Sequence, residues 1–298
     1  MSKFHIPVML NEVLNYLNLA PGKIIVDATI GTGGHSSEIL KKIQPKGKLI
    51  GIDRDEESLE VCRNRLSEFS DSLKLIHGNF ADIDMILKNL KIDKVDGILF
   101  DLGISSYQLD DPERGFSFQN EGPLDMRLDR KSYISAYDLV NNLNEEEISS
   151  LLWNLGQERW HNRIAHLLVQ ERQKQPIATT AQLASIVTRS IPYRYQHQYH
   201  RIHPATRTFQ AVRIAVNREL EILENAIDKS IGFLNKDGRV CVIAFHSLED
   251  RIVKFAFRKN HADGLINIIT PKPLTPALAE VEVNPRARSS KFRVAERA

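Results

Sequence analysis

Short apolar runs alternate with stretches of helical periodicity over the first hundred residues of the chain. The runs lie at residues 23–29, 47–55, 72–80 and 94–103, are rich in β-branched residues and are mostly bounded by glycine. Such runs are typical of buried strands. Strands that alternate with helices at this spacing form βαβ units, so we predict an α/β fold with a parallel sheet.

The alternation stops after Gly103. Residues 104–130 are polar, rich in glycine and proline, and too long for an ordinary connection, which indicates an insertion or a functional loop. Helical patterns without strands follow, and the first begins at an Asn144 cap with Glu147 three residues later. We therefore predict a discontinuous α/β domain, residues 1–104 plus 207–298, that is interrupted by an all-helical domain, residues 105–206.

The returning part of the chain has its own expected elements. Residues 208–235 have the pattern of one long amphipathic helix, and residues 238–245 resume the buried-strand pattern. The last apolar pieces, 264–270 and 290–296, are interpreted as an edge hairpin.

Bulk composition is that of an ordinary globular protein. Of 298 residues, 42% are hydrophobic and 26% charged, and no apolar run approaches the roughly eighteen residues of a membrane span. The start of the chain lacks the form of a signal peptide. Cys62 and Cys241 lie far apart in the sequence. We expect a cytoplasmic protein with no membrane partner.

Positive charge is concentrated in two segments, although the net charge is only +2. Residues 173–218 contain no acid, and residues 284–298 contain one, Glu296. The first segment carries Lys174, Arg189, Arg194, Arg201, Arg207, Arg213 and Arg218, with Tyr193, Tyr195, Tyr199 and Phe209 interleaved. Phosphates bind cations and unstacked bases bind aromatic faces, so we predict nucleic-acid contact there. A solvated charged face is the alternative.

The stretch "VDATIGTGGHSSEIL", residues 26–40, has the form of a nucleotide-binding turn. Gly31 and Gly33 allow a sharp turn and a close approach to a ligand. Asp53 ends the second strand, about twenty residues on, and is placed to accept hydrogen bonds from ribose hydroxyls. The alternative is a tight strand–helix turn beside a solvated Asp53.

Two ligand classes fit such a turn. A dinucleotide would favour a third glycine, whereas this chain has Ser36 there, next to a bulky His35. S-adenosylmethionine carries an amino group and a sulfonium, and both favour carboxylates. Asp27 and Asp101 end the first and fourth strands, so the residues favour the methyl donor.

Longer motifs resemble the bacterial RsmH (MraW) family. They are "GTGGHS", "GIDRD", "DGILFDLGISSYQLDDPERGFSF", "GPLDMRLD", "HPATRTFQAVRIAVNRELE", "AFHSLEDRIVK" and "NPRARSSKFRVAER", and the likeness runs from about residue 5 to the end. The resemblance implies a class I (Rossmann-like) methyltransferase domain with an inserted helical substrate-recognition domain. It also implies an S-adenosylmethionine-dependent enzyme that methylates the N4 amine of a cytidine in 16S ribosomal RNA within the small ribosomal subunit. A homodimer is one hypothesis for the assembly state.

The resemblance also implies site residues. Gly33, Gly34 and His35 match the donor-binding turn, and Asp53 matches the ribose acid. Further matches to donor contacts are Phe80, Asp101 and Gln108. Many amine methyltransferases have Pro-Pro-aromatic after the fourth strand, but this chain has "DLGISS", so the acceptor for the amine protons is not given by that motif.

Two residues are predicted to serve the reaction itself. Asp101 lies at the strand end nearest the donor and is predicted either to hold the target amine or to bind the methionine amine. His246, in "FHSLED", is predicted to line the same pocket, with Ser247 capping the helix that follows and Asp250 at the third helical position.

Other signals leave alternatives open. His197, His200 and His203 are evenly spaced, but the segment has no acid or cysteine, so we predict no metal site. Phe116 and Phe118 belong either to a small core or to a base-stacking platform. Arg207 and Arg213 pair either with phosphate or with a neighbouring acid.

Three rival functions stay open beside the leading one. They are a methyltransferase for DNA or free RNA, an RNA-binding assembly factor without catalysis, and a dinucleotide-dependent reductase. Ser36 and His35 disfavour the reductase.

Overall fold

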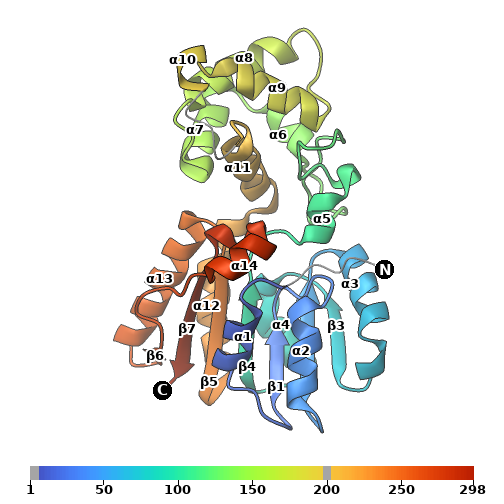
Figure 1. Cartoon of the computed structure of the whole chain (residues 1–298), viewed down its shortest axis with the longest axis vertical. Coiled ribbons are helices and arrows are strands. Elements are labelled where there is room, and N and C mark those ends of the chain that lie inside the picture. Colours follow the sequence, from blue (N-terminus) through green and yellow to red (C-terminus); the bar gives the residue numbers. More distant parts are fainter. Residues whose placement is uncertain (1–6, 197–202) are drawn as a thin grey trace. The chain divides into compact units, whose positions relative to one another are not determined.

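Two compact units make up the chain. The structure, a computed structural model, describes residues 7–196 and 203–298. The sheet unit consists of residues 1–105 and 220–298, and the helical unit is Ser106–Glu219. Strands from the beginning and the end of the sequence share one sheet, as the blue and orange ribbons of Figure 1 show.

A seven-stranded sheet in the order β3-β2-β1-β4-β5-β7-β6 forms the centre of the sheet unit. The first five strands in this order are parallel, and β7 and β6 are antiparallel to their neighbours. Their bounds are β1 (Ile24–Asp27), β2 (Lys48–Asp53), β3 (Leu73–His77), β4 (Val95–Asp101), β5 (Leu234–Ala244), β6 (Ile266–Ile268) and β7 (Lys291–Arg297). The predicted parallel sheet is confirmed. The last two apolar pieces do pair, but of the two only β6 is an edge strand, because β7 lies between β5 and β6.

Helices cover both faces of this sheet. They are α1 (Leu10–Tyr16), α2 (Gly34–Ile43), α3 (Glu56–Arg65), α4 (Ile83–Asn89), α12 (Glu219–Phe233), α13 (Ser247–Ala262) and α14 (Leu278–Val283). Short 3-10 turns lie at Ser67–Phe69, Phe80–Asp82 and Pro285–Ser289.

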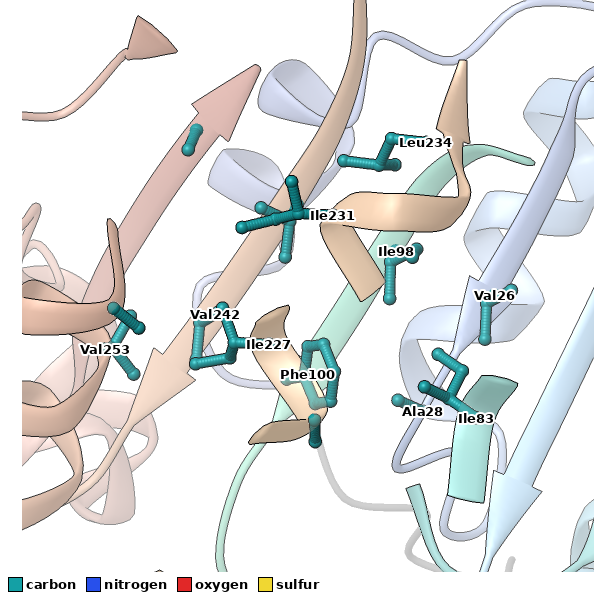
Figure 2. Packing of buried hydrophobic residues seen from close by; sticks show 14 of the residues in the cluster. Val26, Ala28, Ile83, Ile98, Phe100, Ile227, Ile231, Leu234, Val242 and Val253 are labelled. Atoms are coloured by element: carbon teal, nitrogen blue, oxygen red, sulfur yellow. The ribbon is translucent and has the colours of Figure 1, made fainter. Parts of the chain in front are cut away.

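Neighbouring strand residues point into two separate cores. Val26, Ile98 and Phe100 pack against α4, α12 and α13, as Figure 2 shows for part of this cluster. Ile25 and Leu99 belong to the opposite core, which α1, α2 and α3 cover. Because both faces of the central strands β1 and β4 are buried, the interior residues of these strands are mostly apolar and do not alternate with polar ones.

The helical unit is built from short helices. They are α5 (Ser106–Asp110), a 3-10 turn at Pro112–Arg114, α6 (Ala136–Asn142), α7 (Glu145–Gly156), α8 (His161–Arg172), α9 (Thr180–Ser190), α10 (Tyr193–Gln196) and α11 (Thr206–Asn217). The predicted cap of α7 is confirmed, because the Asn144 and Glu147 side chains each accept the other residue's backbone N–H. Thr179 caps α9 in the same way.

The single long helix predicted at residues 208–235 is wrong. The chain forms α11 and α12 and breaks between them at Arg218, whose φ is 52°. The buried Asn217 side chain donates to the Met126 carbonyl and accepts the Leu128 N–H, which ties the end of α11 to a distant loop. These hydrogen bonds end α11 at Asn217, although the apolar periodicity of the sequence continues past this residue.

None of the helices in residues 7–196 and 203–298 combines the length and the apolar character that crossing a membrane requires.

Replacing Phe100 by alanine should test the two-faced sheet. Phe100 is fully buried in the core beneath α12, so Phe100→Ala should lower the free energy of unfolding by about 3–5 kcal/mol. Urea denaturation followed by circular dichroism measures this. Leu278→Ala is the matched control, because Leu278 is 83% exposed, and its effect should stay below about 0.5 kcal/mol. Equal effects of the two substitutions would contradict the assigned core.

Candidate active site

Three carboxylates end three adjacent strands. Asp53, Asp27 and Asp101 are the last residues of β2, β1 and β4, and β1 pairs with both other strands. The carboxyl ends of parallel strands meet at one edge of a sheet, where ligands bind in open α/β folds. This edge is therefore the candidate site.

Asp101 is the strand-end carboxylate that has one oxygen without a hydrogen-bond partner among the described residues. Its backbone N–H donates to Thr29 Oγ1 at 2.7 Å, and its Oδ2 lies 3.4 Å from His35 Nδ1. Oδ1 is buried and accepts no hydrogen bond from any residue that the structure describes. Burial, together with the negative charge of Glu249, raises the pKa of Asp101 to about 7. Oδ1 can thus receive a donor group from a ligand.

His35 is locked in place beside Asp101. The ring is 5% exposed, and its Nε2 lies 2.9 Å from the Val8 carbonyl oxygen. A carbonyl only accepts, so Nε2 carries the proton and donates it, which leaves Nδ1 of the neutral ring as an acceptor. Burial lowers the pKa of His35. Since Nδ1 faces a carboxylate oxygen, a proton on Asp101 turns this contact into a hydrogen bond.

Asp27 is enclosed by the turn that follows it. Ser36 Oγ donates to Asp27 Oδ2 at 2.7 Å, and the Thr29 N–H donates to Oδ1 at 3.3 Å. Burial raises the pKa of Asp27 to about 6. Ser36, which replaces a dinucleotide-type glycine, therefore has a structural role as the partner of a buried acid.

Asp53 stabilises the glycine turn directly. Its two oxygens accept the backbone N–H groups of Gly31, at 2.7 Å, and of Asp55, at 2.9 Å. Burial raises the pKa of Asp53 to about 6. The predicted ribose contact would use the remaining lone pairs of these oxygens and stays a prediction.

Neighbouring protein atoms leave no room for a side chain at Gly33 or Gly34. Gly33 has a φ of 80°, and a Cβ there would lie 2.8 Å from Leu66 Cδ1 and 2.9 Å from Cys62 Sγ. A Cβ on Gly34 would lie 2.9 Å from Pro7 Cγ. Both glycines thus let α2 pack closely against its neighbours, a requirement that exists beside the predicted approach of a ligand.

Two further predicted donor contacts lie in different units. Phe80 belongs to the sheet unit, and its ring meets Phe100 edge-on at 5.6 Å. Gln108 is buried in α5 of the helical unit. Their roles toward a ligand stay predictions.

His246 caps α13, and the predicted cap at Ser247 is wrong by one residue. The Glu249 N–H donates to His246 Nδ1 at 3.4 Å, and Glu249 Oε2 accepts the Phe245 N–H at 2.8 Å. His246 Nε2 lies 3.2 Å from Glu249 Oε1, so both ring nitrogens face this acid. Asp250, predicted at the third helical position, instead pairs with Arg293 at 2.7 Å. The catalytic role of His246 stays a prediction.

Alternatives left open in the helical unit are decided by packing. Phe118 stacks on His203 at 4.5 Å and meets Phe209 at 5.0 Å, and Phe116 is buried with Arg114 over its ring, so both rings pack against protein side chains. Arg213 forms a bidentate ion pair with Glu219, and both N–H···O bonds have donor–acceptor distances of 2.9 Å. His197, Tyr199, His200 and Arg201 lie outside the described residues, and the predictions on them stand untested.

The sequence profile of the MraW methylase family matches residues 2–298. The chain belongs to this family. A relative from Halothermothrix orenii is 48% identical over 98% of both chains, one from Clostridium botulinum is 47% identical over 97% of both, and one from Clostridioides difficile is 43% identical over 98% of both. Each is named ribosomal RNA small subunit methyltransferase H.

Membership in the MraW methylase family agrees with the sheet. The order β3-β2-β1-β4-β5-β7-β6, with β7 antiparallel between β5 and β6, is that of the class I (Rossmann-like) methyltransferase fold that the family resemblance implied. Thr29 and Val8 contact the site residues Asp101 and His35 but were not predicted, because one acts from a turn and the other through its backbone carbonyl.

The raised pKa of Asp101 predicts how stability depends on pH. A carboxyl with a pKa of about 3.9 in the unfolded chain and about 7 in the folded one binds more protons when folded, so it lowers stability as pH rises from 4 to 7. Asp101→Asn removes this penalty. Its Tm should match the wild type near pH 4 and exceed it by several degrees at pH 8.

Scanning calorimetry at both pH values measures this difference. Asp93→Asn, at an exposed aspartate of the same unit, is the control and should show no pH-dependent gain. A Tm of Asp101→Asn at or below the wild-type value at pH 8 would count against a buried, destabilising carboxylate.

Gly33→Ala should separate backbone strain from packing. The left-handed φ alone costs about 1–2 kcal/mol, and the clash with Leu66 and Cys62 adds about 1–3 kcal/mol. Gly264→Ala is the matched control, because its φ is +71° and a Cβ there meets nothing within 4 Å. Denaturant unfolding should show the larger loss for Gly33→Ala, and equal losses would remove the packing argument.

Proposed function

We propose that this protein transfers a methyl group from S-adenosylmethionine to the N4 amine of a cytidine in small-subunit ribosomal RNA. One observation carries the chemistry: a buried Asp101 oxygen without a partner, at the carboxyl end of β4, in a chain of a methylase family. The substrate follows from relatives that are named ribosomal RNA small subunit methyltransferase H and match this chain over nearly their whole length.

The residues at the strand ends fit S-adenosylmethionine. The donor carries a positive ammonium and a positive sulfonium, and the three adjacent strand ends of β2, β1 and β4 present carboxylates. Asp53 is proposed to hold the ribose, Phe80 to lie beside the adenine, and the turn Gly33–His35 to contact the methionine part. When bound, S-adenosylmethionine supplies an electrophilic methyl group on sulfur.

The chain's own residues then handle the amine. The lone pair of a cytosine N4 is delocalised into the ring, so an acceptor that holds the amine N–H groups helps to localise it on nitrogen. Asp101 Oδ1 is such an acceptor. With a pKa of about 7, Asp101 can also receive the proton that the amine loses after methylation. His35 Nδ1 can accept a hydrogen bond from that protonated carboxyl, and His246 is proposed to line the same pocket.

Recognition of the RNA is proposed to fall to the helical unit, Ser106–Glu219. It contains the acid-free segment, residues 173–218, whose cations suit phosphates. A cytosine must also leave its stack to reach a buried carboxylate. We propose the assembled small subunit as the substrate, the cytoplasm as the location, and a homodimer as the assembly state to be tested.

Methyl transfer tests the proposal. Purified protein is incubated with labelled S-adenosylmethionine and, in parallel, with small subunits, free small-subunit RNA or DNA, and the product nucleosides are separated. Label should appear as N4-methylcytidine from the small subunits. Asp101→Ala should lower the rate at least about 100-fold, because both the acceptor and the proton carrier are lost.

The controls separate the rival functions. Asp93→Ala, at an exposed aspartate, should transfer label like the wild type. Donor binding without label in any acceptor would favour an assembly factor, and label in DNA alone would replace the RNA substrate. Sedimentation of the wild type decides between monomer and homodimer.

A further inference from the structure

Two arginines and two aromatic rings contact one another on the helical unit. Arg159 and Trp160 immediately precede α8, and Arg194 and Tyr195 lie on α10. The Trp160 and Tyr195 rings have centroids 5.1 Å apart. The Arg159 guanidinium lies 5.3 Å from the first ring centre and 5.5 Å from the second, and Arg194 lies 4.8 Å from Tyr195. We call these four residues the arginine–aromatic cluster.

The cluster is accessible at the surface. Arg159 and Arg194 are exposed, whereas Trp160 and Tyr195 are partly exposed. The neighbouring Tyr193 is 76% exposed. Trp153 is 55% exposed and lies against His161, the residue that follows Trp160. Large aromatic side chains with this much exposure have apolar faces available to a partner.

The backbone under the cluster is held rigidly. The fully buried Glu158 accepts the Trp160 N–H at 2.9 Å, and Arg163 Nε donates to the Ser190 carbonyl at 2.9 Å, which joins the start of α8 to the end of α9. The Tyr195 N–H donates to the Pro192 carbonyl at 2.8 Å. A partner would therefore meet a preformed surface and would pay little ordering entropy.

The charges of the cluster are not matched by acids within the described part of the chain. Lys174 and Arg189 pair with Glu171, and Arg213 pairs with Glu219. Arg159 and Arg194 instead lie on rings and form no ion pair with any described residue. A ring satisfies the face of a guanidinium but leaves its in-plane N–H donors for an acceptor from outside.

We propose that the arginine–aromatic cluster binds single-stranded RNA of the small subunit, which extends the contact predicted for residues 173–218 to Arg159 and Trp160. Bases stack on exposed aromatic rings, and guanidinium groups bind the phosphates between them. This proposal rests on the proposed function for the identity of the RNA. The alternation of cation and ring favours RNA over an acidic peptide, which would use the charges and leave the ring faces without a partner.

Fluorescence can report on the cluster directly, because the chain has only two tryptophans, Trp153 and Trp160. Trp153→Phe leaves Trp160 as the single reporter, and Trp160→Phe leaves Trp153. Titration of each full-length variant with a ten-nucleotide oligouridine should quench Trp160 more strongly than Trp153. An unquenched Trp160 at saturating oligouridine would overturn the proposal.

Affinity and salt dependence test the arginines. Arg159→Gln and Arg194→Gln should each weaken oligouridine binding about 5- to 20-fold at 50 mM salt and reduce the slope of log affinity against log salt by about 1. Arg63→Gln is the control, since it removes the same charge at an exposed residue of α3 that is paired with Glu60 and lies outside the helical unit, and should change the affinity less than 2-fold. Equal losses in all three variants would overturn a localised site.

Methyl transfer distinguishes this proposal from the proposed function. The KM for small subunits should rise about 10-fold in Arg159→Gln and less than 2-fold in Arg63→Gln. If the wild type methylates no RNA but oligouridine still quenches Trp160, the cluster proposal stands and the proposed function fails. If methylation proceeds and the cluster variants bind RNA like the wild type, the reverse holds. Tighter binding of polyglutamate than of oligouridine would overturn the RNA assignment.

Discussion

The partial or complete burial of three acidic side chains at one sheet edge is the constraint on which the rest of this site depends. A carboxylate taken out of water must be hydrogen-bonded, neutralised or paired with a cation. Asp27 accepts a hydrogen bond from the Ser36 hydroxyl. Asp53 accepts hydrogen bonds from the backbone N–H groups of Gly31 and Asp55. These acids therefore fix the conformation of the glycine turn and the start of α2. Asp101 is only partly compensated. We propose that the N4 amine of the target cytosine supplies the hydrogen bond that Asp101 Oδ1 lacks.

Much of the fold could be predicted because it follows from local rules. Strands buried on two faces must be apolar throughout, and an Asn followed three residues later by Glu is a strong helix start. The break at Arg218 could not be predicted, because Asn217 is held by a loop ninety residues earlier. The cap of α13 was assigned to Ser247 because serine is the commoner cap, whereas the reach of Glu249 to the Phe245 N–H selects His246.

The site was predictable in position and less so in its contacts. Parallel strands that each end in aspartate place Asp27, Asp53 and Asp101 at one edge whatever the details of packing. The hydrogen bonds that position Asp101 and His35 depend on Thr29 Oγ1 and on the Val8 carbonyl, and no sequence pattern indicates a contact made by a backbone carbonyl. The acid-free segment was similarly ambiguous, because the acids that neutralise Lys174 and Arg213 lie just outside it.

The discontinuous sheet unit has a consequence for synthesis on the ribosome. β4 ends at Asp101, but its partner β5 is complete only at Ala244, after the whole helical unit has been made. Roughly 140 residues at about 5–20 residues per second take about 7–30 s. During that time one edge of β4, lined by Ile98, Leu99 and Phe100, has no strand beside it. Until β5 has been made, this edge of the nascent chain can pair with other chains unless a chaperone covers it.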